Sequence, residues 1–98
     1  MQYITTYLIL FVVSGAKILQ QWEYVYRHND LDYNEYILWK SSGQSSKVCG
    51  SMCTHESQCM SYIWNVYKLT CKSFYKIFFS TSSAMVYGNR YYSRRISK

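Results

Sequence analysis

Between residues 45 and 64 the spacing of cysteine and apolar residues changes from a helical period to a strand period. Cys49 and Cys53 are four residues apart, so in a helix they would lie on one face, one turn apart. The serines just ahead can cap such a helix, because a serine hydroxyl accepts a free backbone N–H. Residues 59–64 (CMSYIW) alternate between two faces, which predicts a strand. The stretch therefore predicts a helix that offers two sulfurs to a neighbouring sheet.

Aromatic and apolar runs predict further strands on both sides of this stretch. An aromatic first strand is expected around Trp22–His28, and a second at 36–39. The polar loop 41–46 would lead into the helix. After Cys71, the further strand candidates are residues 74–79, 84–87 and, beyond the Gly88-Asn89 turn, 90–92.

Residues 1–16 have the composition of a secretory signal peptide. They contain no charged side chain, and Tyr7–Val13 forms an apolar core followed by small residues at Ser14 and Ala16. Cleavage after Ala16 is expected, which would leave residues 17–98 as one small domain. An uncleaved membrane anchor is the rival interpretation, but the apolar run is well short of the roughly 20 residues that span a bilayer.

The pattern C-x3-C-x5-C-M-S-Y-I-W-N-x5-C resembles the core of PAN/apple domains. In that family the third cysteine is followed by small–aromatic–x–aromatic–Asn, which here is Ser61 to Asn65. The resemblance extends to the aromatic strand at 22–28 and to the closing Y-G-N-R-Y-Y-S-R. It implies an α+β fold with a single helix packed across a small antiparallel sheet. The chain has Cys71-Lys72-Ser73 where the family usually has C-x-L. It also lacks the extra pair of true apple domains, so it looks like the two-disulfide PAN form.

Four cysteines permit three disulfide pairings. A Cys49–Cys53 bond would join residues that the helix already holds together. The family resemblance implies Cys49–Cys71 and Cys53–Cys59 instead. Loop closure alone would make these bonds worth about 3.4 and 2.4 kcal/mol, respectively. A zinc site with His55 is the competing interpretation, but this spacing lacks the tight paired knuckles of structural zinc sites. A signal peptide also favours disulfides.

Charge is distributed unevenly along the chain. The net charge is +6, all five acids lie between residues 23 and 56, and seven of the eleven bases follow them. This asymmetry favours anionic partners. Sulfated, heparin-like glycans would suit the basic half, and some PAN domains bind heparin. A solvated basic tail is the alternative, and nucleic acid conflicts with secretion. The candidate glycan-binding residues are Lys72, Lys76, Arg90, Arg94 and Arg95. Strand parity would place the two lysines on one face.

Catalysis is not expected. A cysteine nucleophile needs a free thiolate and a base, whereas these cysteines are expected to be bridged. The only imidazoles, His28 and His55, are expected to be solvated, as are the acids at 23–35. No metal or cofactor is expected. The sequence thus predicts a secreted, non-catalytic module that recognises an extracellular protein or glycan. The alternative is a cationic secreted effector that acts on membranes.

Overall fold

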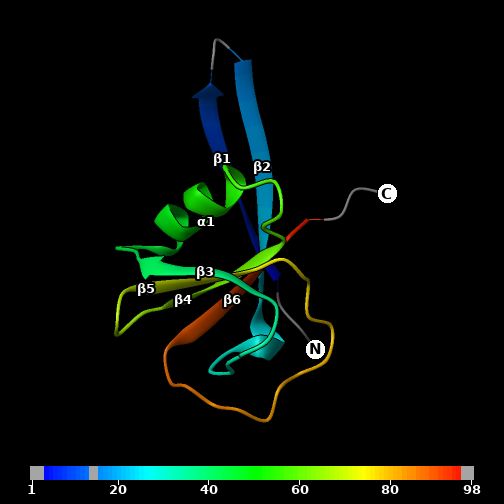
Figure 1. The fold of residues 1–98 in the computed structure, drawn as a ribbon, viewed down its shortest axis with the longest axis vertical. Coiled ribbons are helices and arrows are strands. Elements are labelled where there is room, and N and C mark those ends of the chain that lie inside the picture. The colour runs from blue at the N-terminus through cyan, green and yellow to red at the C-terminus, as the bar shows by residue number, and fades with distance from the viewer. Residues whose placement is uncertain (1–3, 14–15, 96–98) are drawn as a thin grey trace.

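The computed structural model describes residues 4–13 and 16–95, with side chains from residue 21 onward (Figure 1). It contains one α-helix, one short 3-10 helix and one antiparallel sheet with strand order β1-β2-β6-β4-β5-β3. The elements are β1 (Ile4–Val13), β2 (Ala16–Val25), η1 (Tyr26–His28), β3 (Ile37–Ser42), α1 (Ser46–Thr54), β4 (Ser61–Asn65), β5 (Thr70–Phe74) and β6 (Asn89–Arg94). The predicted α+β fold, with a single α-helix and an antiparallel sheet, is confirmed.

The helix begins where the sequence predicts. The Ser45 hydroxyl accepts the backbone N–H of Val48 at 3.2 Å, which satisfies one free donor at the helix start. At the other end, the Trp22 indole N–H donates to Thr54 Oγ1 at 3.0 Å and so ties α1 to β2. The helix is thereby held on one face of the sheet.

Both disulfides inferred from the family resemblance are present. Cys49 bonds to Cys71 with a Cα–Cα distance of 5.6 Å, and Cys53 bonds to Cys59 at 5.3 Å. The first joins α1 to β5. The second closes the turn between α1 and β4. Two such bonds in a chain this small are typical of proteins from oxidising compartments.

Strand β4 alternates as predicted, and its two sets of side chains enter two separate cores. Tyr62 lies on the helix face and packs edge-on against Trp22, with ring centroids 5.2 Å apart. Ile63 lies on the opposite face, in register with Tyr91 of β6 and Lys72 of β5. The helix-face core is made of Trp22, Cys49, Cys53, Cys59, Tyr62 and Cys71. The opposite core is made of Val25, Tyr33, Ile63, Phe74 and Tyr91.

The predictions of strands at residues 74–79 and 84–87 are wrong. Strand β5 ends at Phe74, and the second segment makes only an isolated bridge between Leu31 and Met85. Of the aromatic residues there, Phe74 and Phe78 pack in the opposite core, whereas Tyr75, Phe79 and Tyr87 are exposed. Phe78 stacks on Tyr33 with ring centroids 4.1 Å apart. The first strand also ends earlier than expected, at Val25.

The prediction that His28 is solvated is also wrong, because its side chain is fully buried. Its Nδ1 shares a hydrogen bond with the Tyr33 hydroxyl, and its ring lies 4.7 Å from that of Tyr91. Burial is the main cause that lowers the pKa of His28 to about 4, and the positive charge of Arg27 adds to it. His28 is therefore a neutral core residue near neutral pH.

The segment interpreted as a signal peptide contains strand β1, which pairs with β2 from Ile4↔Val25 to Val13↔Ala16. Cleavage after Ala16 stays a prediction, and Ser14 lies outside the described residues. Such cleavage would remove β1 and leave β2 held by β6 through residues 22–24. Within the described ranges, no helix is long and apolar enough to cross a membrane.

Candidate functional site

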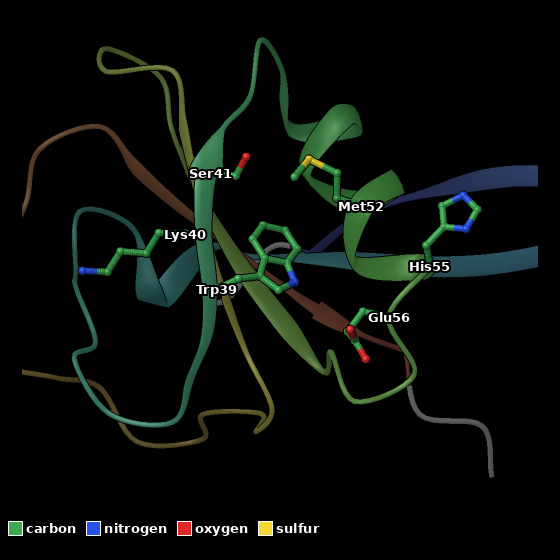
Figure 2. A pocket seen from close by; sticks show the side chains of 6 residues that line it. All are labelled: Trp39, Lys40, Ser41, Met52, His55 and Glu56. Carbon is green, nitrogen blue, oxygen red and sulfur yellow. The ribbon is translucent and has the colours of Figure 1, made fainter.

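A groove of about 490 Å³ lies on the helix face, between α1 and strand β3 (Figure 2). Because β3 is the last strand in the sheet order, the groove lies at an edge of the sheet. Its walls are mostly apolar, with a few polar groups, which is the usual character of a ligand site. The residues that line it are Trp39, Lys40, Ser41, Met52, His55 and Glu56.

Strand alternation decides which side chains of β3 enter the groove. Trp39 and Ser41 are two residues apart and point toward α1, whereas the Lys40 side chain points away (Figure 2). The Trp39 backbone is fixed by Ser73 of β5, whose hydroxyl accepts the Trp39 N–H at 3.2 Å and donates to its carbonyl at 3.3 Å. The indole therefore stands on a strand that is anchored to the sheet.

Trp39 differs from the other two tryptophans in the use of its indole N–H. Trp22 donates to Thr54 and Trp64 donates to the Gly43 carbonyl at 2.9 Å. No described residue accepts a hydrogen bond from Trp39 Nε1, and that edge of the ring is turned toward the Glu56 side of the groove (Figure 2). The Trp39 side chain is half-buried and its N–H is not among the buried groups without a partner, so this donor is open to water or to a ligand. Trp39 thus presents an aromatic ring and a donor to an incoming ligand.

The opposite wall comes from the end of α1 and the turn after it. Met52 contributes a thioether that points toward the strand, and the Glu56 carboxylate lies across from the indole (Figure 2). The Glu56 backbone is held twice, by its N–H to the Cys53 carbonyl at 3.1 Å and by its carbonyl to the Cys59 N–H at 3.0 Å. The Cys53–Cys59 disulfide closes this same turn. His55 is exposed and its ring points away from the groove.

Glu56 also differs from most of the acids in its charge environment. Three of the five acids are paired with bases: Asp32 with Lys72, Asp30 with Arg90 and Glu23 with Arg95. In the part of the chain that the structure describes, no base lies within ion-pair distance of Glu56. Among the described residues, its carboxylate accepts a single hydrogen bond, from the Gln58 N–H at 3.5 Å. Glu56 is therefore an acid without an ion-pair partner among the described residues, in a groove whose lining also includes Lys40, with its side chain turned away (Figure 2).

The five predicted glycan-binding residues are distributed over both faces of the sheet and the loops, and each already has a partner. Arg94 donates to the Cys59 carbonyl at 2.7 Å and its guanidinium lies 5.3 Å from the Trp22 ring. Burial lowers the pKa of this guanidinium. Lys76 lies over the Tyr36 ring at 4.5 Å. The other three are the ion-paired bases Lys72, Arg90 and Arg95.

The structure contradicts two arguments for that glycan site: that Lys72 and Lys76 share a strand face, and that no acid offsets the bases of the second half. Lys76 lies beyond the end of β5 at Phe74, so strand parity does not place it beside Lys72. Acids from the first half of the chain return to offset the bases of the second half, as Asp32 does for Lys72 at 2.9 Å. Glycan binding by these residues stays a prediction.

Sequence reasoning missed the groove. In the sequence, Trp39 belongs to a predicted strand and Glu56 is only the last of the five acids. The two are 17 positions apart, and no local pattern connects them. All four cysteines are in disulfides, so none is left as a thiolate for zinc or for nucleophilic attack. What remains in the groove is chemistry suited to binding: an aromatic surface, an N–H donor and a carboxylate.

Comparison with known proteins finds no family model, no curated protein and no solved structure that matches this chain. The resemblance to PAN/apple domains accordingly stays a prediction, and the groove has to be interpreted from its own residues.

Proposed function

We propose that this protein is a secreted, non-catalytic recognition module, similar to PAN/apple domains, that binds an extracellular protein or glycan in the groove between α1 and β3. The observation that carries the proposal is Trp39, which presents an indole ring and an N–H without an acceptor among the described residues, in a groove faced by Glu56. Solvent-accessible tryptophans of this kind dominate binding energy at interfaces, because they bury a large surface with few rotatable bonds.

The rigidity of the groove supports the same proposal. One wall is a strand hydrogen-bonded along β5, and the other is a helix end closed by the Cys53–Cys59 disulfide. A pre-ordered site loses little conformational entropy when its ligand arrives. The two disulfides are in keeping with an extracellular place of action.

The likeness to PAN/apple domains draws support from three features. The helix lies on an antiparallel sheet, its two cysteines reach β5 and the turn before β4, and the aromatic strand β4 is central to the core. These are the features that the resemblance implied.

A comparison of three baits tests the function. The oxidised protein, Trp39→Ala and Tyr87→Ala would be applied to a glycan array and to a library of extracellular proteins. A partner of the groove should bind the first and third baits and lose at least tenfold in affinity for the second, as expected for an interface tryptophan. Tyr87 is the matched control, since it is an exposed aromatic residue that does not line the groove. A partner that binds all three baits equally would contradict the proposal.

The alternative of a cationic membrane effector is tested with vesicles that contain anionic lipid. A folded recognition module should cause no leakage of a trapped dye. Leakage by the oxidised protein, together with no partner for any bait, would favour the effector.

A further inference from the structure

The Glu56 carboxylate points to the charge of the ligand. The chain carries eleven bases and five acids, so an acid would be expected to find a base easily. Asp30 and Asp32 do so, at 3.0 and 2.9 Å. Glu56 does not within the described residues, although its backbone is held in place by the Cys53–Cys59 turn. A carboxylate at the rim of a mostly apolar groove is complementary to a cation.

The ring opposite Glu56 points to the shape of that cation. Tryptophan is the side chain whose face attracts cations most strongly. A guanidinium is planar, stacks on an aromatic face and forms two parallel hydrogen bonds with a carboxylate. Its aliphatic stem can lie along apolar side chains, and Met52 supplies a thioether on the same wall as Glu56.

From these features we infer that the groove binds an arginine side chain exposed on a protein partner, with the guanidinium against the Trp39 ring and paired with Glu56. The inference rests on the proposed function and names the partner's chemistry. It also gives a role to the Trp39 N–H, since a backbone carbonyl of the partner beside the arginine can accept it. A lysine ammonium would pair with Glu56 but lacks the planar fork.

A sugar fits this groove less well. A sugar ring carries hydroxyl groups around its whole edge, and a buried hydroxyl without a partner is costly. The polar side chains that face the groove are Trp39, Ser41 and Glu56, whereas those of Lys40 and His55 point away from it (Figure 2). The Ser41 hydroxyl donates to the neighbouring Ser42 carbonyl at 3.2 Å, which leaves fewer donors for a sugar.

The three tryptophan indole N–H signals of the full, oxidised protein provide the assay. The probe is N-acetyl-arginine amide, titrated in the millimolar range while indole ¹H–¹⁵N resonances are followed. The Trp39 signal should move with saturation. The signals of Trp22 and Trp64 should stay in place, because those N–H groups are already bonded to Thr54 and Gly43. N-acetyl-citrulline amide has the same shape without the charge, and it should bind at least tenfold more weakly.

Two variants separate the carboxylate from general charge. Glu56→Gln keeps the size of the side chain and should weaken the arginine probe by roughly tenfold or more. Glu35→Gln removes the other acid without an ion pair in the described residues and should leave the titration unchanged. Unmoved Trp22 and Trp64 signals in each free variant show that the fold is intact.

Several outcomes would overturn the inference: equal binding of the arginine and citrulline probes, a Glu56→Gln variant that binds like the wild type, or a Trp39 signal that glucose or galactose moves and arginine does not. These outcomes are distinct from failure of the proposed function. A natural partner that needs Trp39 but binds Glu56→Gln with wild-type affinity would leave the recognition function standing and refute the arginine assignment. Partner binding that is lost with both Trp39→Ala and Glu56→Gln would support both.

Discussion

The two faces of the sheet are covered in different ways. On one face, α1 is attached by two disulfides and by the Trp22–Thr54 hydrogen bond. On the other face, two long loops, residues 29–36 and 75–88, lie over an aromatic core without any covalent link. Both faces belong to the same strands, so they differ only in how the helix and the loops are attached to the sheet.

The loop-covered face is held by polar contacts that the loops make with each other and with β6. Asp30 Oδ1 accepts from the Gly88 N–H at 2.8 Å and from Arg90 at 3.0 Å. The Phe78 N–H donates to the Tyr91 hydroxyl at 2.8 Å. The strength of an ion pair such as Asp30–Arg90 depends on pH, because the carboxylate must be ionised. A disulfide depends instead on the redox state of the surroundings. The two faces should consequently respond to different chemical perturbations, and the groove lies on the face that is cross-linked.

The largest effect is expected from removal of the Cys49–Cys71 disulfide. Because it closes a loop of 22 residues, the double substitution Cys49→Ala/Cys71→Ala should lower the free energy of unfolding by about 3.4 kcal/mol. Urea titration measures this loss. Hydrogen exchange should show that the α1 amides lose more protection than those of β6. The matched control is Cys53→Ala/Cys59→Ala, which removes the bond that closes the shorter loop of 6 residues and should cost about 2.4 kcal/mol. Equal losses would contradict the loop-closure argument.

Acid should act on the loop-covered face through His28. Its pKa of about 4 in the folded protein lies below its ordinary value of 6.5, so the unfolded chain takes up the proton first as pH falls. The stabilising contribution is complete above pH 6.5 and is lost progressively toward pH 4, by about 3 kcal/mol in total. Urea titrations across this pH range measure the slope of the unfolding free energy against pH. His28→Gln should flatten that slope even if it also lowers stability.

The control for this effect is His55→Gln. That ring is exposed at the end of α1, on the other side of the sheet, so the slope should be retained. A slope that persists in His28→Gln would show that another group governs the acid response.

The next effect tests how tightly the cross-linked face is packed. A Cβ atom at Gly43 would lie 2.3 Å from Cys71 Sγ and 2.9 Å from Cys49 Sγ. A disulfide cannot swing aside as a flexible side chain would, so Gly43→Ala should cost about 2 kcal/mol, as overpacking does. Ser42→Ala at the exposed neighbouring position should change little. A Gly43→Ala variant with a wild-type melting temperature would show that the loop beside the disulfide can yield.

The cross-linked face was also the part of the fold that the sequence predicted best. The helix, its Ser45 cap and the alternation of β4 are local patterns, readable within a few residues. The disulfide pairing followed from the family resemblance, because spacing alone left the pairings open.

The loop-covered face could not be predicted, since its order depends on contacts between distant residues. Residues 74–79 have a strand composition, but Phe78 packs on Tyr33, which is 45 positions away. His28 has a polar side chain, and it is buried only because the loops fold over it. The groove has the same origin, since Trp39 and Glu56 become neighbours only when α1 docks on the sheet.

The smallest effect concerns Lys72, which was a candidate for glycan binding and which the structure places in the loop-covered half. Its ammonium has three donors, and three acceptors surround it: Asp32 at 2.9 Å, the Tyr33 carbonyl at 3.1 Å and Asn34 at 3.2 Å. Both side chains of the ion pair are largely shielded, at 17% and 16% exposure. Lys72→Met should therefore cost about 1–2 kcal/mol, between the values for exposed and buried pairs.

The same substitution tests whether Lys72 also binds a sulfated glycan. With all three donors engaged, the ammonium would have to leave Asp32 before it could bind sulfate, so Lys72→Met should change retention on heparin very little. Lys76 lies over the Tyr36 ring with no ion-pair partner among the described residues, and Lys76→Met should reduce retention more while costing less stability. The reverse order on heparin would show that the Lys72–Asp32 pair opens, because only an opened pair frees the ammonium. Such a result would place a glycan contact on the loop-covered face and leave the groove for a different partner.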